Sequence, residues 1–207
     1  MKFKLIYKKY SAELLIVLIG AILFIPFLGR VHLFDWDEIN FAEAAREMLI
    51  THNYTQVQID FLPFWEKPPL FIWLQAISMK IWGINAFGAR FPNAICGIVT
   101  MLCLYRMGKR LFNHQFGILW TLIYCGTFLP FLYFKSGIID PVFNLFIFLS
   151  IFYLSYTTDK QFANRTRYIF LSGLFLGLAI LTKGPVALLI LLICSAVIFL
   201  ISGFNRF

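Results

Sequence analysis

The chain has 207 residues, of which 60% are hydrophobic and 19% aromatic, and its formal net charge is +8. A soluble domain with so much apolar surface would aggregate, so the composition excludes an ordinary soluble domain. The basic residues lie between apolar runs rather than along one face, which favours a membrane topology over nucleic acid as a partner. The four cysteines lie inside apolar segments without CxxC spacing, and we interpret them as packing residues.

Six apolar runs are long enough to cross a bilayer and predict an all-α polytopic membrane protein. The expected spans are residues 12–28, 91–107, 116–134, 142–156, 168–181 and 186–202. No internal repeat or low-complexity linker separates them. Residues 1–207 are therefore predicted to form a single transmembrane unit, in which residues 30–90 make one long outer loop.

This outer loop is predicted to hold two helices that lie along the membrane surface, at residues 37–50 and 69–82. In the first helix three apolar and three polar side chains separate onto two faces. The apolar face comprises Phe41, Ala45 and Met48, and the polar face comprises Asn40, Glu43 and Glu47. Residues 51–64 show no strong period and are predicted to be an extended loop. Pro68 and Pro69 suit the first turn of the second helix.

The distribution of basic residues predicts the orientation. With a cytoplasmic N-terminus, the inner loops collect 11 of the 18 bases, which are Lys2, Lys4, Lys8, Lys9, Arg106, Lys109, Arg110, Lys160, Arg165, Arg167 and Arg206. Both termini are then cytoplasmic and the protein is integral to the inner (plasma) membrane. The same placement brings five candidate site residues to the outer side: Asp37, Glu66, Lys67, Asp140 and Lys183.

Seven of the ten acidic residues lie between Asp35 and Glu66. Ionisable groups near a bilayer are costly and mark function. Asp37 and Glu38 follow the first span, where a carboxylate suits a general base or a cation ligand, and equally suits helix capping.

The run Glu66-Lys67-Pro68-Pro69 is more specific. A lysine at headgroup depth beside the start of a helix is well placed to bind a phosphate, because the helix N-terminus also favours anions. Glu66 would orient that lysine or bind a divalent ion. The alternative is a local Glu66–Lys67 pair with a snorkelling lysine.

Three further charged positions fall at the predicted outer ends of spans. Asp140, before Pro141, resembles an N-cap and could pair with Lys135. Thr182-Lys183-Gly184-Pro185 either ends a helix or offers a lysine and glycine backbone to a phosphate. Arg90 is predicted to be a membrane-edge anchor.

The order of these motifs resembles that of a known enzyme class. Residues 37–48 (DEINFAEAAREM) and 64–70 (FWEKPPL) are similar to consecutive signatures of glycosyltransferase family 39 and of its relative, the lipid A aminoarabinose transferase family. Residues 140–143 (DPVF) and 182–184 (TKG) resemble two later motifs. The resemblance implies the GT-C class, membrane enzymes that take a sugar from a polyprenyl phosphate.

The resemblance also implies roles for particular residues. Asp37 would be the catalytic carboxylate and Asp140 a second acidic site residue. Lys67 would hold the lipid phosphate, with Glu38 and Lys183 as further substrate contacts. Glu66 would organise the site, through a divalent metal ion if one is present.

Two positions depart from the aminoarabinose transferases. Asn40 stands where they typically carry Arg, and Phe64 where they often carry Tyr. These departures weaken the assignment of aminoarabinose as the sugar and leave membership of the wider family intact. Family members continue into further spans and an outer C-terminal domain, so the C-terminal half of that architecture is expected to be missing from this chain. A fragment, a truncated reading frame and one part of a split enzyme all stay open.

The function expected from this resemblance is transfer of a sugar from a polyprenyl-phosphate donor to a lipid, glycan or protein acceptor at the outer face. The alternative is a non-catalytic membrane subunit or truncated remnant that binds lipid phosphate or a partner protein.

Overall fold

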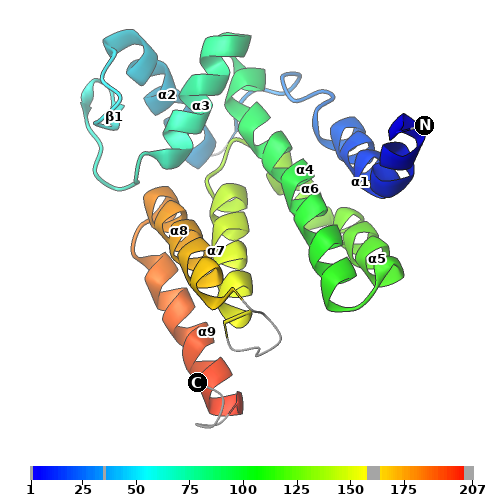
Figure 1. Cartoon of the computed structure of the whole chain (residues 1–207). Coiled ribbons are helices and arrows are strands. Elements are labelled where there is room, and N and C mark those ends of the chain that lie inside the picture. The colour runs from blue at the N-terminus through cyan, green and yellow to red at the C-terminus, as the bar shows by residue number, and fades with distance from the viewer. Residues whose placement is uncertain (1, 35, 158–163, 203–207) are drawn as a thin grey trace.

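The computed structural model describes residues 2–34, 36–157 and 164–202 (Figure 1). Apart from one hairpin of two-residue strands, the elements of these residues are helices. In chain order they are α1 (Lys2–Phe24), α2 (Trp36–Thr51), β1 (Gln58–Ile59), β2 (Leu62–Pro63), α3 (Leu70–Trp82), α4 (Ala86–Leu111), α5 (His114–Cys125), α6 (Phe128–Phe134), α7 (Asp140–Ser155), α8 (Arg165–Lys183) and α9 (Val186–Ser202). The predicted all-α class is confirmed.

The predicted spans correspond to helices of unequal length. By length and composition, α4 and α8 are the two helices of the described residues that could cross a membrane, and α5 with α6 would make a third, bent by 73°. Shorter apolar helices occupy the other three predicted spans, at Tyr10–Phe24, Asp140–Ser155 and Val186–Ile198. The bend lies where Pro130 removes the N–H that would bond the carbonyl of Gly126 in a continuous helix.

The helices form two arms that meet at one end (Figure 1). In one arm α1 and α5 pack against α4, and in the other α7 packs against α8, with α9 following. Small residues allow the closest approach, because a Cβ built on Gly108 would lie 2.8 Å from the Cα of Gly117 across the α4–α5 interface. The helices α2 and α3 pack together where the arms meet, and α3 also packs against α4 (Figure 1).

Both predicted helices of the outer loop are present, at α2 and α3. The predicted apolar face of α2 is confirmed, because Phe41, Ala45 and Met48 are buried, and Phe41 packs edge-on against Phe71 of α3. The predicted polar face is wrong at Glu47, whose side chain is fully buried. The position of α2 and α3 relative to a membrane stays a prediction.

Candidate functional site

Three of the predicted site residues line one groove. Glu66 and Lys67, which precede α3, face Lys183 and Gly184 at the end of α8 across a cavity of about 560 Å³. Other lining residues come from the loop after α2 and from the turn between α8 and α9. Within the described residues, no hydrogen bond or ion pair involves the side chain of Glu66 or Lys67. The local Glu66–Lys67 pair considered above is therefore not formed.

The loop that carries Glu66 and Lys67 is held by a buried carboxylate. Asp60 and Phe61, between β1 and β2, have φ of 55° and 59°, which strains residues with a Cβ. Glu47 of α2 accepts a hydrogen bond from the backbone N–H of Phe61 at 2.9 Å, and Trp73 of α3 donates to the carbonyl of Tyr54 at 2.6 Å. The predicted extended loop is thus a short hairpin tied to α2 and α3.

The opposite wall of the groove is the turn between α8 and α9. As predicted, the helix breaks after Lys183, and Gly184 takes a φ of 84°, which favours glycine. A Cβ built on Gly184 would lie 3.9 Å from Cγ of Pro68, so the two walls approach each other here.

Lys183 also joins the groove to α7. Its Nζ lies 2.5 Å from Oδ1 of Asp140, and both side chains are about one third exposed, at 34% and 29%. The N-cap of α7 is Ile139 and Asp140 is the first residue of the helix, so the prediction that Asp140 is an N-cap is wrong. Its predicted pairing with Lys135 is wrong, because Lys135 donates instead to the carbonyls of Leu23 and Pro26 at the end of α1.

A second ion pair is buried and does not line the groove. Arg90 of α4 binds Glu38 of α2 through both oxygens, at 2.7 Å and 2.8 Å. Arg90 is 2% exposed and Glu38 is 1% exposed. The prediction that Arg90 is a membrane-edge anchor is therefore wrong, and Glu38 does not line the groove.

Sequence reasoning missed two buried amides beside this pair. Asn93 of α4 and Gln75 of α3 are fully buried. Asn93 donates to the carbonyls of Ser136 and Ile138, and Gln75 donates to those of Gly137 and Ala89. The available signal was a pair of large polar side chains, Gln75 and Asn93, inside otherwise apolar helical stretches.

The two predicted catalytic carboxylates lie at the starts of two helices, α2 and α7. Asp37 is half-buried in the first turn of α2, and no hydrogen bond or ion pair of its carboxylate is found in the described part of the chain. Its neighbour Glu38 accepts a hydrogen bond from the N–H of Gly137, three residues before Asp140. Further along α2, the Arg46 guanidinium lowers the pKa of Glu43 below its ordinary value.

Metal ligation is not evident in the described residues, which contain no group of three or more His, Cys, Asp or Glu side chains close enough to hold an ion. Glu66 as a metal ligand stays a prediction.

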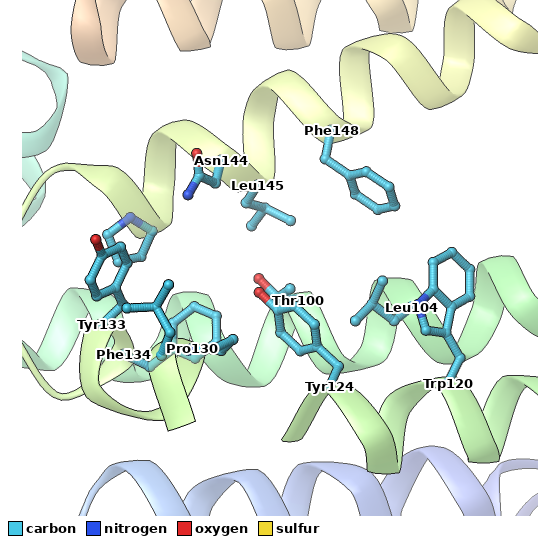
Figure 2. Close-up of a pocket in the computed structure, with 12 residues that line it drawn as sticks. Thr100, Leu104, Trp120, Tyr124, Pro130, Tyr133, Phe134, Asn144, Leu145 and Phe148 are labelled. Carbon is cyan, nitrogen blue, oxygen red and sulfur yellow. The ribbon is translucent and has the colours of Figure 1, made fainter. Parts of the chain in front are cut away.

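A second cavity, of about 360 Å³, lies between α4, α5, α6 and α7 (Figure 2). Tyr124, Tyr133 and Asn144 contribute polar atoms, and most of the remaining lining is aliphatic or aromatic, including Leu145 and Phe148. One of its lining residues is Pro141, which directly follows Asp140 in the sequence.

The helices and their apolar surfaces define an all-helical integral membrane protein. Residues 66–206 match the family described as dolichyl-phosphate-mannose-protein mannosyltransferase, and the chain belongs to that family. The match includes Glu66, Lys67, Asp140 and Lys183, whereas Asp37 precedes it. The predicted relation to GT-C glycosyltransferases is confirmed.

Curated relatives carry more specific names. The chain is 30% identical over 183 residues to an undecaprenyl phosphate-alpha-4-amino-4-deoxy-L-arabinose arabinosyl transferase from Photorhabdus laumondii, covering 87% of this chain and 33% of that protein. It is 31% identical over 183 residues to a protein described as arabinosyl transferase 2 of the same kind from Proteus mirabilis, covering 83% of this chain and 33% of the relative. The chain thus spans about a third of the length of these relatives.

Solved structures show the same fold. ArnT from Cupriavidus metallidurans in the apo state superimposes with a TM-score of 0.85 at 19% identity, over 96% of this chain and 37% of that chain. Its structure bound to undecaprenyl phosphate gives a TM-score of 0.81 at 21% identity, over 91% and 36% of the two chains. At these identities the likeness establishes the fold alone.

Proposed function

We propose that the chain forms the donor site of a membrane glycosyltransferase that takes a sugar from a polyprenyl phosphate. The observation that carries the proposal is the convergence of Lys67 and Lys183 on one groove beside two carboxylates, Glu66 and Asp140. Family membership supports the reaction class, and the names of the curated relatives support undecaprenyl phosphate as the lipid carrier.

The lysines would act on the leaving group. When the bond between the sugar and the phosphate breaks, negative charge grows on the lipid phosphate, and a positioned ammonium stabilises that charge. Lys67 supplies this group from the start of α3, and Lys183 supplies a second from the opposite wall. Glu66, which forms no ion pair with Lys67 in the described residues, would contribute by binding a divalent cation that shares the phosphate.

The carboxylates would act on the acceptor. If the acceptor is a hydroxyl of a lipid, glycan or protein, Asp37 would accept its proton as attack proceeds. If the acceptor is a phosphate, no base is needed and Asp37 would orient it. Attack opposite the leaving lipid implies inversion at the sugar carbon, with Asp140 as the second acidic residue.

The membrane placement proposed from the basic loops fits this chemistry. With both termini cytoplasmic in the inner membrane, the groove faces the outer side at headgroup depth. The mostly apolar cavity of Figure 2 is lined in part by Pro141, which follows Asp140 in the sequence, and it suits an isoprenoid chain.

Binding of undecaprenyl phosphate to the purified chain in nanodiscs tests the proposal. Replacing Lys67 by Ala removes one charge-assisted contact and should weaken binding about tenfold to a hundredfold. Lys80→Ala is the matched control, because Lys80 is exposed on α3 and lies outside the groove. If both variants bind like the wild type, the groove is not a donor site, and a non-catalytic membrane subunit becomes the better description.

Asp37→Asn tests the chemistry separately, in any preparation of the chain that transfers sugar. Turnover should be lost while undecaprenyl phosphate binding is retained, because Asp37 does not line the groove. Near-normal turnover would rule out the proposed role of Asp37.

A further inference from the structure

We propose that Arg90 and Asn93, one helical turn apart on α4, are positioning residues that hold Asp37 and Asp140 in a fixed relation. The inference rests on the proposed function, which assigns chemistry to those two carboxylates. Neither Arg90 nor Asn93 lines the groove, so they act through the backbone segments that carry the carboxylates.

Arg90 fixes the chain that enters α2. A guanidinium has five N–H donors, and all five are used here, two on Glu38 and three on backbone carbonyls. Those carbonyls belong to Leu28, Val31 and His32. One side chain therefore holds both the connection from α1 and the first turn of α2, in which Asp37 lies.

Glu38 links the first turn of α2 to the loop that precedes α7. Its carboxylate accepts four hydrogen bonds, two from Arg90 and one each from the N–H groups of Phe34 and Gly137. The contact with Gly137 is 2.5 Å long and joins residues 99 positions apart in the sequence. The residue beside Asp37 is thus bonded to the loop that leads into Asp140.

Asn93 fixes the other side of that loop. Its amide donates to the carbonyls of Ser136 and Ile138, at 2.7 Å and 2.6 Å, and Gln75 donates to the carbonyl between them. Three successive carbonyls before α7 are therefore held by buried amides. A Cβ built on Gly137 would lie 3.2 Å from both Cγ and Oε1 of Glu38, so glycine permits this close approach.

These contacts suit a positioning role. Charge-assisted hydrogen bonds in a desolvated site are short and directional, and functional groups need support from residues that are themselves fixed. Lysine keeps the charge of arginine but not its planar fork, so Arg90→Lys should loosen the geometry without removing the positive charge. Asn93→Leu removes the amide while keeping a similar size.

The direct test measures the separation of the two helix starts. Spin labels at Ile39 of α2 and Asn144 of α7, both exposed, are introduced after the four native cysteines are replaced by Ala. Electron–electron distance distributions are recorded in nanodiscs, with each variant well below its own unfolding temperature. Arg90→Lys and Asn93→Leu should each broaden the distribution or shift its mean, whereas Arg106→Lys, a change at an exposed arginine on the same helix, should do neither.

A second readout separates positioning from a general loss of fold. In a preparation that transfers sugar, the two variants should lower kcat by about a hundredfold, because a misplacement of 1 Å is enough for such a loss. The dissociation constant for undecaprenyl phosphate, which depends on Lys67, should change little. Equal losses in kcat and in lipid binding would overturn the inference.

The outcomes remain separable from those of the proposed function. If the wild type neither binds undecaprenyl phosphate nor transfers sugar, the proposed function fails, and the distance measurement still decides whether Arg90 and Asn93 fix the helix starts. If both variants keep the wild-type distance distribution, the positioning role is wrong even where transfer is measured.

Discussion

The two ion pairs near the junction of the arms differ in almost every physical respect. Glu38–Arg90 is buried, with side chains 1% and 3% exposed, and its carboxylate and guanidinium make further hydrogen bonds to backbone. Asp140–Lys183 is about one third exposed and lies beside an open groove, and one contact of 2.5 Å, between Nζ of Lys183 and Oδ1 of Asp140, joins the two side chains.

This difference separates groups that keep the geometry from groups that can exchange partners. A buried charge without its partner is costly, so Glu38 and Arg90 are held to each other. An exposed pair gains little, because water and ions compete for both charges. Lys183 can therefore leave Asp140 for an incoming phosphate, and Arg90 cannot leave Glu38 at similar cost.

Breaking the buried pair should give the largest effect. Arg90→Met leaves the Glu38 carboxylate buried without its main partner and should lower the free energy of unfolding by about 3–5 kcal/mol. Thermal unfolding of the purified chain in detergent would show this as a large fall in the unfolding temperature.

The double variant Glu38→Met with Arg90→Met is the informative control. It removes both charges, so it should recover much of the loss seen in the single variant. If the single variant unfolds like the wild type, the pair is not desolvated as the structure shows, and the contrast between the two pairs disappears.

A smaller effect is expected where the buried network meets the loop before α7. Gly137→Ala forces a methyl group against Glu38 and Gln75, at 3.2 Å and 3.3 Å, and should cost about 1–3 kcal/mol of stability. Gly173→Ala on α8 is the matched control, because nothing lies within 4 Å of a Cβ built there. That change should be neutral or stabilising, since alanine favours a helix. Equal unfolding temperatures for the two variants would show that the loop moves aside readily.

The groove was predictable from the sequence because its determinants are local. Pro68 and Pro69 mark the start of α3, and Gly184-Pro185 marks the end of α8, so the motifs placed Lys67 and Lys183 at helix ends. The distribution of basic residues then predicted that both helix ends lie on the outer side of the membrane, so Lys67 and Lys183 were expected to lie in one site.

The buried network was not predictable in the same way. Glu38 and Arg90 are 52 residues apart, and each has a plausible local interpretation at a helix start or a membrane edge. Glu47 looked like a solvent-facing residue because helical periodicity cannot show that a hairpin covers that face. Such partners depend on which segments the fold brings together, and no local pattern records that.

Substitution of Lys183 should give the smallest change in stability. It also separates an effect on stability from an effect on lipid binding most clearly. Lys183→Met breaks an ion pair that is about one third exposed, so stability should change by about 0–1 kcal/mol. The same change removes one of two ammonium groups from the groove and should weaken undecaprenyl phosphate binding by about tenfold. Unfolding temperature and lipid affinity, measured on the same nanodisc preparation, check both parts. A large fall in stability with unchanged binding would mean that Lys183 serves the α7–α8 packing, and that the exposed pair resembles the buried one after all.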